Sequence, residues 1–204
     1  MVTDGVLTIG QHIVVGNWEE PLQKALGGRL ASAGESVLEI GFGLGLASRT
    51  ITSLQPKTHW IIEAHEEVFV NALHMHSNKS NTILIHGLWE ETVPRIASSS
   101  FSSILFDPYP FDGTVFDGSL TATWTMIKPF LDHASRLLMP SGVIGFVDFS
   151  DQMDAYRHLI KSEGMPFELS EYKRFPIAPD AGCPYSSSHT CNYVILTKVE
   201  TALC

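Results

Sequence analysis

The sequence is poor in cysteine and has no long apolar run. Its three cysteines, Cys183, Cys191 and Cys204, form no C-x-x-C pair, and their odd number argues against a disulfide framework and a structural zinc site. No stretch of about 18 apolar residues occurs, so no membrane-spanning helix is expected. The first sixteen residues lack the basic region and apolar run of a secretory signal. We therefore expect a cytoplasmic protein with reduced thiols and no membrane partner.

Positive charge is also scarce. The 204 residues include 13 lysines and arginines against 22 aspartates and glutamates, which gives a formal net charge of −9. Such a surface repels phosphate backbones, so nucleic acid is not an expected partner, whereas a cationic small molecule suits it. Among the nine histidines, no pair four residues apart is joined by an acid in a ligand pattern, so no metal site is expected.

Apolar strands alternate with amphipathic helices along most of the chain. This alternation predicts parallel pairing through right-handed crossovers, with helices on both faces of one sheet. The last two strands have no helix between them, so one of them is expected to run antiparallel. The predicted strands cover 36–40, 59–62, 82–86, 103–106, 143–149, 167–174 and 192–199. The predicted helices cover 17–33, the segment from the glycine-rich loop to about 54, 66–74, a segment ending at 138, and 151–162.

We expect one domain over residues 1–204, with an α/β Rossmann-like fold and a mostly parallel seven-stranded sheet. The N-terminal part, residues 1–34, is expected to be a helical segment that caps the pocket.

A glycine-rich segment follows the first predicted strand. Open parallel sheets bind ligands beyond the carboxyl ends of their strands, and Gly41-Phe42-Gly43-Leu44-Gly45 stands at that point, directly after Glu39 and Ile40. Glycines allow left-handed backbone angles and let a ligand lie against the main chain. The pattern is G-x-G-x-G and lacks the third glycine that dinucleotide folds place one residue later, so a cofactor without a pyrophosphate is favoured. S-adenosylmethionine fits this requirement, with Glu39 near its ammonium group.

The next two strand ends carry groups suited to an adenosine. Glu63 ends the second strand, eighteen residues after Gly45, and its carboxylate can accept two hydrogen bonds from ribose hydroxyls. Trp89 and Glu90 follow the third strand, where an indole can cover an adenine and a polar group can bond its amine. The alternative for Trp89 is packing in the core.

The fourth strand ends in Asp107-Pro108-Tyr109-Pro110, beside the first strand in a sheet of this kind. Methyl transfer is an in-line displacement at a sulfonium carbon, so the acceptor must present a free lone pair along the carbon–sulfur axis. A carboxylate held by prolines accepts N–H bonds, orients the nitrogen and favours loss of its proton. We therefore expect Asp107 to act in catalysis and Tyr109 to contact the acceptor. The alternative is that the prolines only form a tight turn.

A second carboxylate, Glu19, starts the predicted N-terminal helix beside Trp18. Two carboxylates can grip a planar guanidinium through paired hydrogen bonds, so Glu19 and Asp107 are a candidate pair around such an acceptor. Without that pairing, Glu19 is only an N-terminal acid that the helix dipole favours. Phe149 and Ser150 close the fifth strand and can line the far side of the pocket.

Six runs of residues, spread from about residue 9 to residue 198, occur in the order and at about the spacing seen in one known family. Two of them, His59-Trp60-Ile61-Ile62-Glu63 and Gly87-Leu88-Trp89-Glu90, are far more specific than the glycine loop. The others cover 17–21, 37–43, 105–110 and 133–138. Together these runs resemble the guanidinoacetate N-methyltransferases and the related fungal arginine N-methyltransferases of the δ-nitrogen type, which are class I S-adenosylmethionine-dependent methyltransferases.

The resemblance implies a class I methyltransferase fold and methyl transfer to a guanidino or amino nitrogen of a small molecule. It places the cofactor on residues 42–47, the ribose at Glu63 and the adenine between Leu88 and Trp89. The expected cofactor contacts are Glu39, Gly41, Phe42, Gly43, Leu44, Gly45, Leu46, Ala47, Glu63, Ala64, His65, Gly87, Leu88, Trp89 and Asp107. The expected acceptor contacts are Trp18, Glu19, Asp107, Tyr109, Phe149 and Ser150, the last two through backbone.

Departures from the family pattern leave the acceptor open. The resemblance leads us to expect a shortened form of the family's longer aromatic N-terminal segment. Val15 replaces a methionine, His65 an asparagine and Pro108 a threonine. Guanidinoacetate is therefore one candidate among other guanidines and amines. A catalytically silent binding module and a nicotinamide-dependent oxidoreductase stay open as alternatives, as does assembly into a homodimer.

Overall fold

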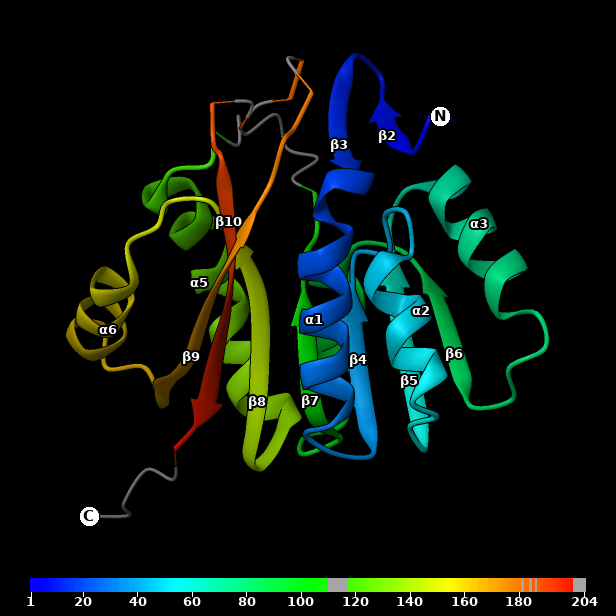
Figure 1. Cartoon of the computed structure of the whole chain (residues 1–204). Coiled ribbons are helices and arrows are strands. Elements are labelled where there is room, and N and C mark those ends of the chain that lie inside the picture. The colour runs from blue at the N-terminus through cyan, green and yellow to red at the C-terminus, as the bar shows by residue number, and fades with distance from the viewer. Residues whose placement is uncertain (110–116, 181, 184, 186, 200–204) are drawn as a thin grey trace.

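The computed structural model describes residues 1–109, 117–180, 182–183, 185 and 187–199. Seven strands form one sheet in the order β6-β5-β4-β7-β8-β10-β9 (Figure 1). These are β4 (Ser36–Ile40), β5 (Thr58–Glu63), β6 (Thr82–His86), β7 (Phe101–Phe106), β8 (Leu138–Asp148), β9 (Phe167–Pro176) and β10 (Thr190–Lys198). The first five strands in chain order pair in parallel, and β10 runs antiparallel to both β8 and β9. The predicted sheet, with its one antiparallel strand, is confirmed.

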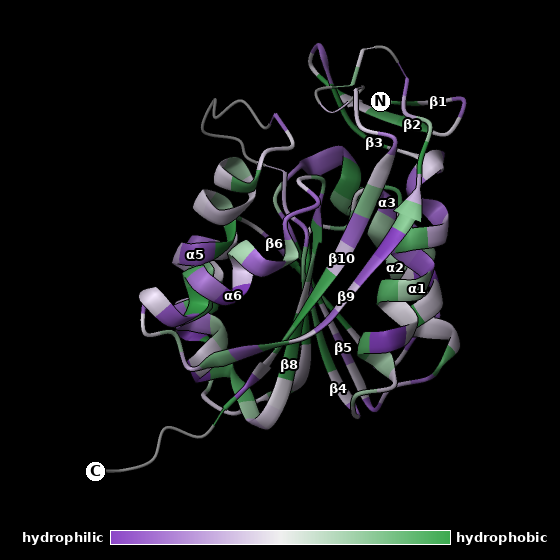
Figure 2. Cartoon of the chain, turned by 60° about the vertical axis from the view of Figure 1, so that its left-hand side comes forward, coloured by the Kyte–Doolittle hydropathy of each residue, from purple (hydrophilic) through white to green (hydrophobic). Residues whose placement is uncertain are grey.

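Helices cover both faces of this sheet because its central strands bury side chains on both sides. On one face lie α1 (Glu20–Ala31), α2 (Leu46–Ser53) and α3 (Glu66–His76), and on the other α5 (Leu120–Leu137) and α6 (Met153–Ser162). The short α4 (Trp89–Thr92) lies on the α5 side, where Trp89 packs against Phe130. Strand β4 shows the alternation: Val37 belongs to the core under α1 and α2, whereas Leu38 and Ile40 belong to the core under α5. Two short 3-10 helices lie at Asn17–Glu19 and Val93–Arg95. Figure 2 shows hydrophilic residues on outward sides of α5 and α6 and apolar stretches on central strands such as β8.

The N-terminal segment differs from its prediction. Residues 2–16 form a three-stranded antiparallel sheet of β1 (Val2–Thr3), β2 (Val6–Ile9) and β3 (His12–Gly16), so the helical prediction for 1–34 is wrong for this part and holds only from residue 17 onward. Asp4 and Gly5 both have positive φ, at 49° and 81°, which is the geometry of a two-residue hairpin turn. The β-branched residues on either side then favour strands over a helix.

Gly41, directly after β4, controls how closely two strand ends approach. Its φ is +86°, and a Cβ atom there would lie 2.4 Å from the backbone carbonyl oxygen of Asp107. The Asp107 N–H donates to the Ile40 carbonyl at 2.9 Å, and the Gly41 N–H donates to the Ile62 carbonyl at 2.9 Å. The first glycine of the loop therefore holds the end of β7 beside the ends of β4 and β5.

Substituting Gly41 tests this close approach. Gly41→Ala should lower the free energy of unfolding by about 3 kcal/mol or more, because it combines a left-handed backbone angle with a backbone collision. Gly10→Ala is the matched control, since Gly10 has a φ of +61° and no atom within 4 Å of an added Cβ. It should lose only about 1 kcal/mol, from the backbone angle alone. Equal losses in urea denaturation would contradict the collision.

Candidate active site

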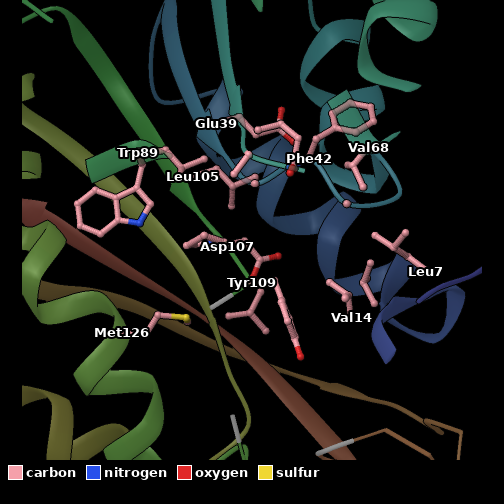
Figure 3. Close-up of a pocket in the computed structure, with 18 of the residues that line it drawn as sticks. Leu7, Val14, Glu39, Phe42, Val68, Trp89, Leu105, Asp107, Tyr109 and Met126 are labelled. Carbon is pink, nitrogen blue, oxygen red and sulfur yellow. The ribbon is translucent and has the colours of Figure 1, made fainter. Parts of the chain in front are cut away.

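A cavity of about 540 Å³ opens beyond the carboxyl ends of β4, β5 and β7. Its walls come from the glycine-rich loop, the strand ends, β2 and β3, and the α5 helix. In Figure 3, Trp89 and Met126 lie on one side of the cavity and Leu7 and Val14 on the opposite side, with Asp107 between them. The cavity therefore lies at the edge of the sheet where ligands bind in open parallel folds.

Glu63 is fixed at the end of β5 by two backbone donors. The Phe42 N–H donates to Glu63 Oε2 at 2.8 Å, and the His65 N–H donates to Glu63 Oε1 at 2.7 Å. Each carboxylate oxygen keeps further acceptor capacity. The side chain is 6% exposed and lines the cavity. Glu63 thus ties the glycine loop to β5 and can still accept hydrogen bonds from a ligand.

Glu39 lies beneath the glycine loop and is paired with a buried histidine. His59 Nε2 and Glu39 Oε2 are 2.8 Å apart, and both side chains are 1% exposed. The His59 ring meets the His76 ring edge-on at 5.8 Å. Burial lowers the pKa of His76 to about 4, and repulsion from His59 and Lys79 adds to the effect. Glu39 lines the cavity, but one of its oxygens is held from behind by the protein itself.

The Trp89 indole combines the two arrangements that its sequence position left open. It packs edge-on against Phe106 at 5.7 Å and against Phe130 at 5.2 Å, so it belongs to the rim of the core. It is also half-buried and lines the cavity together with Leu88. A planar ligand group can therefore contact an indole that the core already holds in place.

Glu19 and Asp107, predicted as a pair, line the same cavity. Gln23, one helical turn after Glu19, donates from Nε2 to Asp107 Oδ2 at 2.7 Å and also hydrogen-bonds the Glu19 carboxylate. The Tyr185 hydroxyl donates to Glu19 Oε1. The two carboxylates are thus joined through one amide.

Both carboxyl groups have raised pKa values. Burial raises the pKa of Glu19 to about 8, and repulsion from Asp107 adds to it, while hydrogen bonds from Tyr185 and Gln23 oppose it. Desolvation raises the pKa of Asp107 to about 6, opposed by the Gln23 hydrogen bond and assisted by the charge of Glu39. A cation placed between the two groups would relieve the repulsion and favour the ionised forms.

Four of the predicted contacts do not line the cavity. Trp18 is half-buried and packs against the core under α1, where its ring covers Gly16 so closely that a Cβ there would lie 2.2 Å from it. His65 offers its N–H to Glu63, and Gly45, with a φ of +68°, is the N-cap of α2. Ser150 directs both its N–H and its hydroxyl to Asp148. The remaining predicted residues line the cavity: Glu19, Glu39, Gly41, Phe42, Gly43, Leu44, Leu46, Ala47, Glu63, Ala64, Gly87, Leu88, Trp89, Asp107, Tyr109 and Phe149.

The sequence did not point to several groups in the cavity wall. Gln23 was accessible to reasoning, because it stands four residues after Glu19 on the same helical face. Tyr185 was not, because it lies in a segment rich in proline, glycine and serine with no periodic pattern. Its ring stacks on Phe149 with centroids 4.0 Å apart. Apolar side chains of β2 and β3, such as Ile13 and Val14, were missed with the strands that carry them.

The described part of the chain gives three further observations. Cys183 and Cys191 are buried free thiols. Within the described ranges, no group of three or more His, Cys, Asp or Glu side chains is placed to hold a metal ion. None of the helices found there has the length and apolarity needed to cross a membrane.

The family model described as guanidinoacetate N-methyltransferase matches residues 2–168, which include all the predicted site residues. The chain belongs to the guanidinoacetate N-methyltransferase family. The match confirms the family that the six runs suggested and the methyltransferase class expected from them. Tyr185 lies outside the matched residues.

Relatives of this family member include fungal proteins named protein arginine N-methyltransferase 2. That of Yarrowia lipolytica is 26% identical over 188 residues, covering 86% of the chain and 38% of the relative. That of Saccharomyces cerevisiae is 25% identical over 182 residues, covering 84% of the chain and 42% of the relative. The chain therefore spans less than half the length of these two curated relatives.

Solved structures share the fold at low sequence identity. The N-methyltransferase NodS from Bradyrhizobium japonicum, in complex with S-adenosyl-L-homocysteine, has a TM-score of 0.60 at 13% identity, with 90% of the chain and 89% of NodS covered. TYW2 from M. jannaschii, in complex with AdoMet, has a TM-score of 0.59 at 14% identity, with 97% and 87% covered. Their likeness confirms the predicted fold class, a class I methyltransferase fold.

The pKa of Glu19 makes a prediction about stability. Because its folded-state pKa of about 8 lies above its ordinary value of 4.5, the folded state holds a proton that the unfolded state has released. The free energy of unfolding should therefore fall as the pH rises from about 4.5 to 8. Between about pH 5 and about pH 9, the free energy of unfolding of Glu19→Gln should fall by on the order of 3 kcal/mol less than that of the unchanged protein.

Glu20→Gln is the control for this measurement. Glu20 is the next residue and pairs with Lys24 at the surface, so its neutralisation should leave the pH dependence of unfolding nearly unchanged. Denaturant titrations of the three proteins across the pH range make the comparison. If Glu19→Gln keeps the full pH dependence, the raised pKa is wrong.

Proposed function

We propose that this chain is an N-methyltransferase that carries a methyl group from S-adenosylmethionine to a guanidino or amino nitrogen of a small molecule. One observation carries the proposal. Glu19 from the N-terminal segment and Asp107 from the end of β7 meet at the cavity that the glycine loop and Glu63 border. Two carboxylates joined by one amide, and raised in pKa by burial, form a site for a planar cation.

The chemistry of the cavity wall supports S-adenosylmethionine as the cofactor. Gly43, with a φ of +54°, and Gly41 expose main chain to the cavity. Glu63 retains acceptor capacity for ribose hydroxyls, and the half-buried Trp89 offers a surface for the adenine. When bound, this cofactor supplies an activated methyl group on a sulfonium. Acidic groups such as Glu39 suit its positive charges.

The acceptor site would work through charge and alignment. Asp107 accepts N–H bonds and so points one acceptor nitrogen toward the cofactor side of the cavity. Its pKa of about 6 suits acceptance of the proton that the nitrogen loses as the new N–C bond forms. Gln23 holds the Asp107 carboxylate, and Tyr185 holds Glu19, which takes the second edge of the guanidinium.

A second candidate acceptor is an arginine side chain in a protein. The fungal relatives carry this substrate in their name, and peptidyl arginine presents the same guanidinium. The two candidates use the same pair of carboxylates and differ only in the group to which the guanidinium is attached. An acceptor panel must therefore include a blocked arginine next to small guanidines and amines.

Incubation with S-adenosylmethionine labelled in its methyl group tests the function directly. Label should pass to guanidines or amines of the panel, and calorimetric titration should show cofactor binding. Cofactor binding without transfer to any acceptor would favour a silent binding module. Failure to bind the cofactor below millimolar concentration would remove the methyltransferase assignment altogether.

Asp107→Asn separates chemistry from cofactor binding. Turnover with the best acceptor should fall by about 10²-fold or more, the usual contribution of a positioned acid–base group. The dissociation constant for S-adenosylmethionine should stay within about threefold, because the carboxylate is held by Gln23 on the acceptor side. Asp117→Asn, at an exposed carboxylate that does not line the cavity, is the control and should keep full turnover. Equal turnover in both variants would exclude Asp107 from the mechanism.

A further inference from the structure

The end of β8 is organised around one buried carboxylate, Asp148, which is fully inaccessible to water. Six donors converge on its two oxygens. Oδ1 accepts from the Ser150 N–H at 3.1 Å, the Ser150 hydroxyl at 2.7 Å and the Tyr156 hydroxyl at 2.7 Å. Oδ2 accepts from the Asp151 N–H at 3.3 Å, the Tyr172 hydroxyl at 2.7 Å and Asn192 Nδ2 at 3.4 Å. The fold therefore holds this carboxylate in a fixed position through hydrogen bonds to both of its oxygens.

Asp148 accepts hydrogen bonds from two backbone N–H groups that could otherwise bind the anionic group of a ligand. Successive N–H groups in a turn form a common anion-binding arrangement, and here the N–H groups of residues 150 and 151 already serve the protein's own carboxylate. Because side chains alternate along a strand, Val147 and Phe149 line the cavity while Asp148 lies behind them. A fixed negative charge thus stands directly behind this wall.

The cavity also lacks a positive group to compensate. No Lys, Arg or His belongs to its lining among the residues that the structure describes. The internal positions outside the described ranges, 110–116, 181, 184 and 186, contain none of these residue types in the sequence. The acids that do line it are Glu19, Glu39, Glu63, Glu90 and Asp107.

In the protein wall, an acceptor carboxylate would therefore meet like charges and no cationic side chain. Removing a charge from water without a partner is strongly unfavourable. The wall beyond the two carboxylates is instead apolar and aromatic, with Phe149 stacked on Tyr185 and with Ile13 and Val14 across the cavity. This surface suits an acceptor whose part beyond the guanidinium or amine is neutral.

We infer that the acceptor has no carboxylate: it is a guanidine or amine whose positive nitrogen end lies between Glu19 and Asp107 and whose remaining part is neutral. The inference rests on the proposed function and narrows its acceptor. It separates this chain from the acceptor in its family's name, since guanidinoacetate joins a carboxylate to the guanidinium by a single carbon.

Isosteric pairs that differ only in charge test the inference. They are guanidinoacetate against guanidinoacetamide, 4-guanidinobutyrate against 4-guanidinobutyramide, and N-acetylarginine against its amide. In each pair that accepts labelled methyl, kcat/KM should be at least tenfold higher for the amide. Acids that react as fast as their amides would overturn the inference while leaving the proposed function intact. If only N-acetylarginine and its amide accept labelled methyl, the acceptor is the arginine side chain of a peptide or protein. The inference is then tested by the ratio of kcat/KM between these two compounds.

Binding supplies a second readout that needs no turnover. The same six compounds are titrated by calorimetry into protein loaded with S-adenosyl-L-homocysteine, and each amide should bind at least tenfold more tightly than its acid. Absence of transfer together with this binding preference would contradict the proposed function but support the inference. Equal affinities of acid and amide within the pairs would overturn the inference. Absence of binding by all six compounds would overturn it as well.

Asp148→Asn tests the source of the discrimination. The carboxamide oxygen keeps acceptor capacity for the Ser150 N–H, the Ser150 hydroxyl and the Tyr156 hydroxyl, and the NH2 group that replaces Oδ2 can donate to the Tyr172 hydroxyl. The negative charge is removed, so the amide-to-acid ratio should fall severalfold. Asp154→Asn, an exposed carboxylate on α6 that pairs with Arg157, is the matched control and should keep the wild-type ratio. An unchanged ratio in a folded Asp148→Asn protein would remove Asp148 from the explanation.

Discussion

Two carboxyl groups that are close enough to repel each other, Glu19 buried and Asp107 half-buried, are the interaction on which the candidate site depends. Glu19 is 4% exposed, and its pKa rises to about 8 mainly because the ionised form loses hydration. The fold tolerates the pair through Gln23, Tyr185 and a retained proton, none of which fully replaces water. The electrostatic cost that remains supports the proposal that this site takes a cation. A hydrophobic pair at these positions would favour the empty fold and remove the proposed affinity for a cation.

The architecture of the sheet makes this arrangement possible. The close approach at Gly41 brings the end of β7 against the ends of β4 and β5, so Asp107 and Glu63 open into one cavity. The 3-10 helix Asn17–Glu19 and the α1 helix that follows it add Glu19 and Gln23 to this cavity from a distant part of the chain. The strands β2 and β3 add apolar side chains, such as Leu7 and Val14, to the wall of the same cavity.

Local sequence patterns predict much of this structure. The features that depend on long-range contacts could not be predicted from such patterns. The bounds of β4 and β6 were predictable to the residue, because short apolar runs stood between clear breakers. The pairing of Glu19 with Asp107 was accessible only through the charge pattern and the family resemblance. Tyr185 reaches Glu19 across 166 residues, a contact that no periodicity encodes. The hairpin over residues 2–9 was missed because strand and turn signals in so short a segment were weaker than the adjoining helical pattern.

The displacement of Ser150 from the cavity shows how one buried side chain changes the chemistry of a family site. The resemblance placed backbone near Phe149 and Ser150 at the acceptor. Asp148 instead draws the Ser150 N–H and hydroxyl behind the wall, supported by two tyrosines whose own pKa values rise through burial beside its charge. Only Phe149 remains at the surface of the cavity, and it contributes an aromatic face. The carboxylate pair proposed to bind a cation is thus retained, while Phe149 and Tyr185 give the cavity an aromatic wall. Acceptor preference can therefore change without any change in the groups proposed to position the reacting nitrogen.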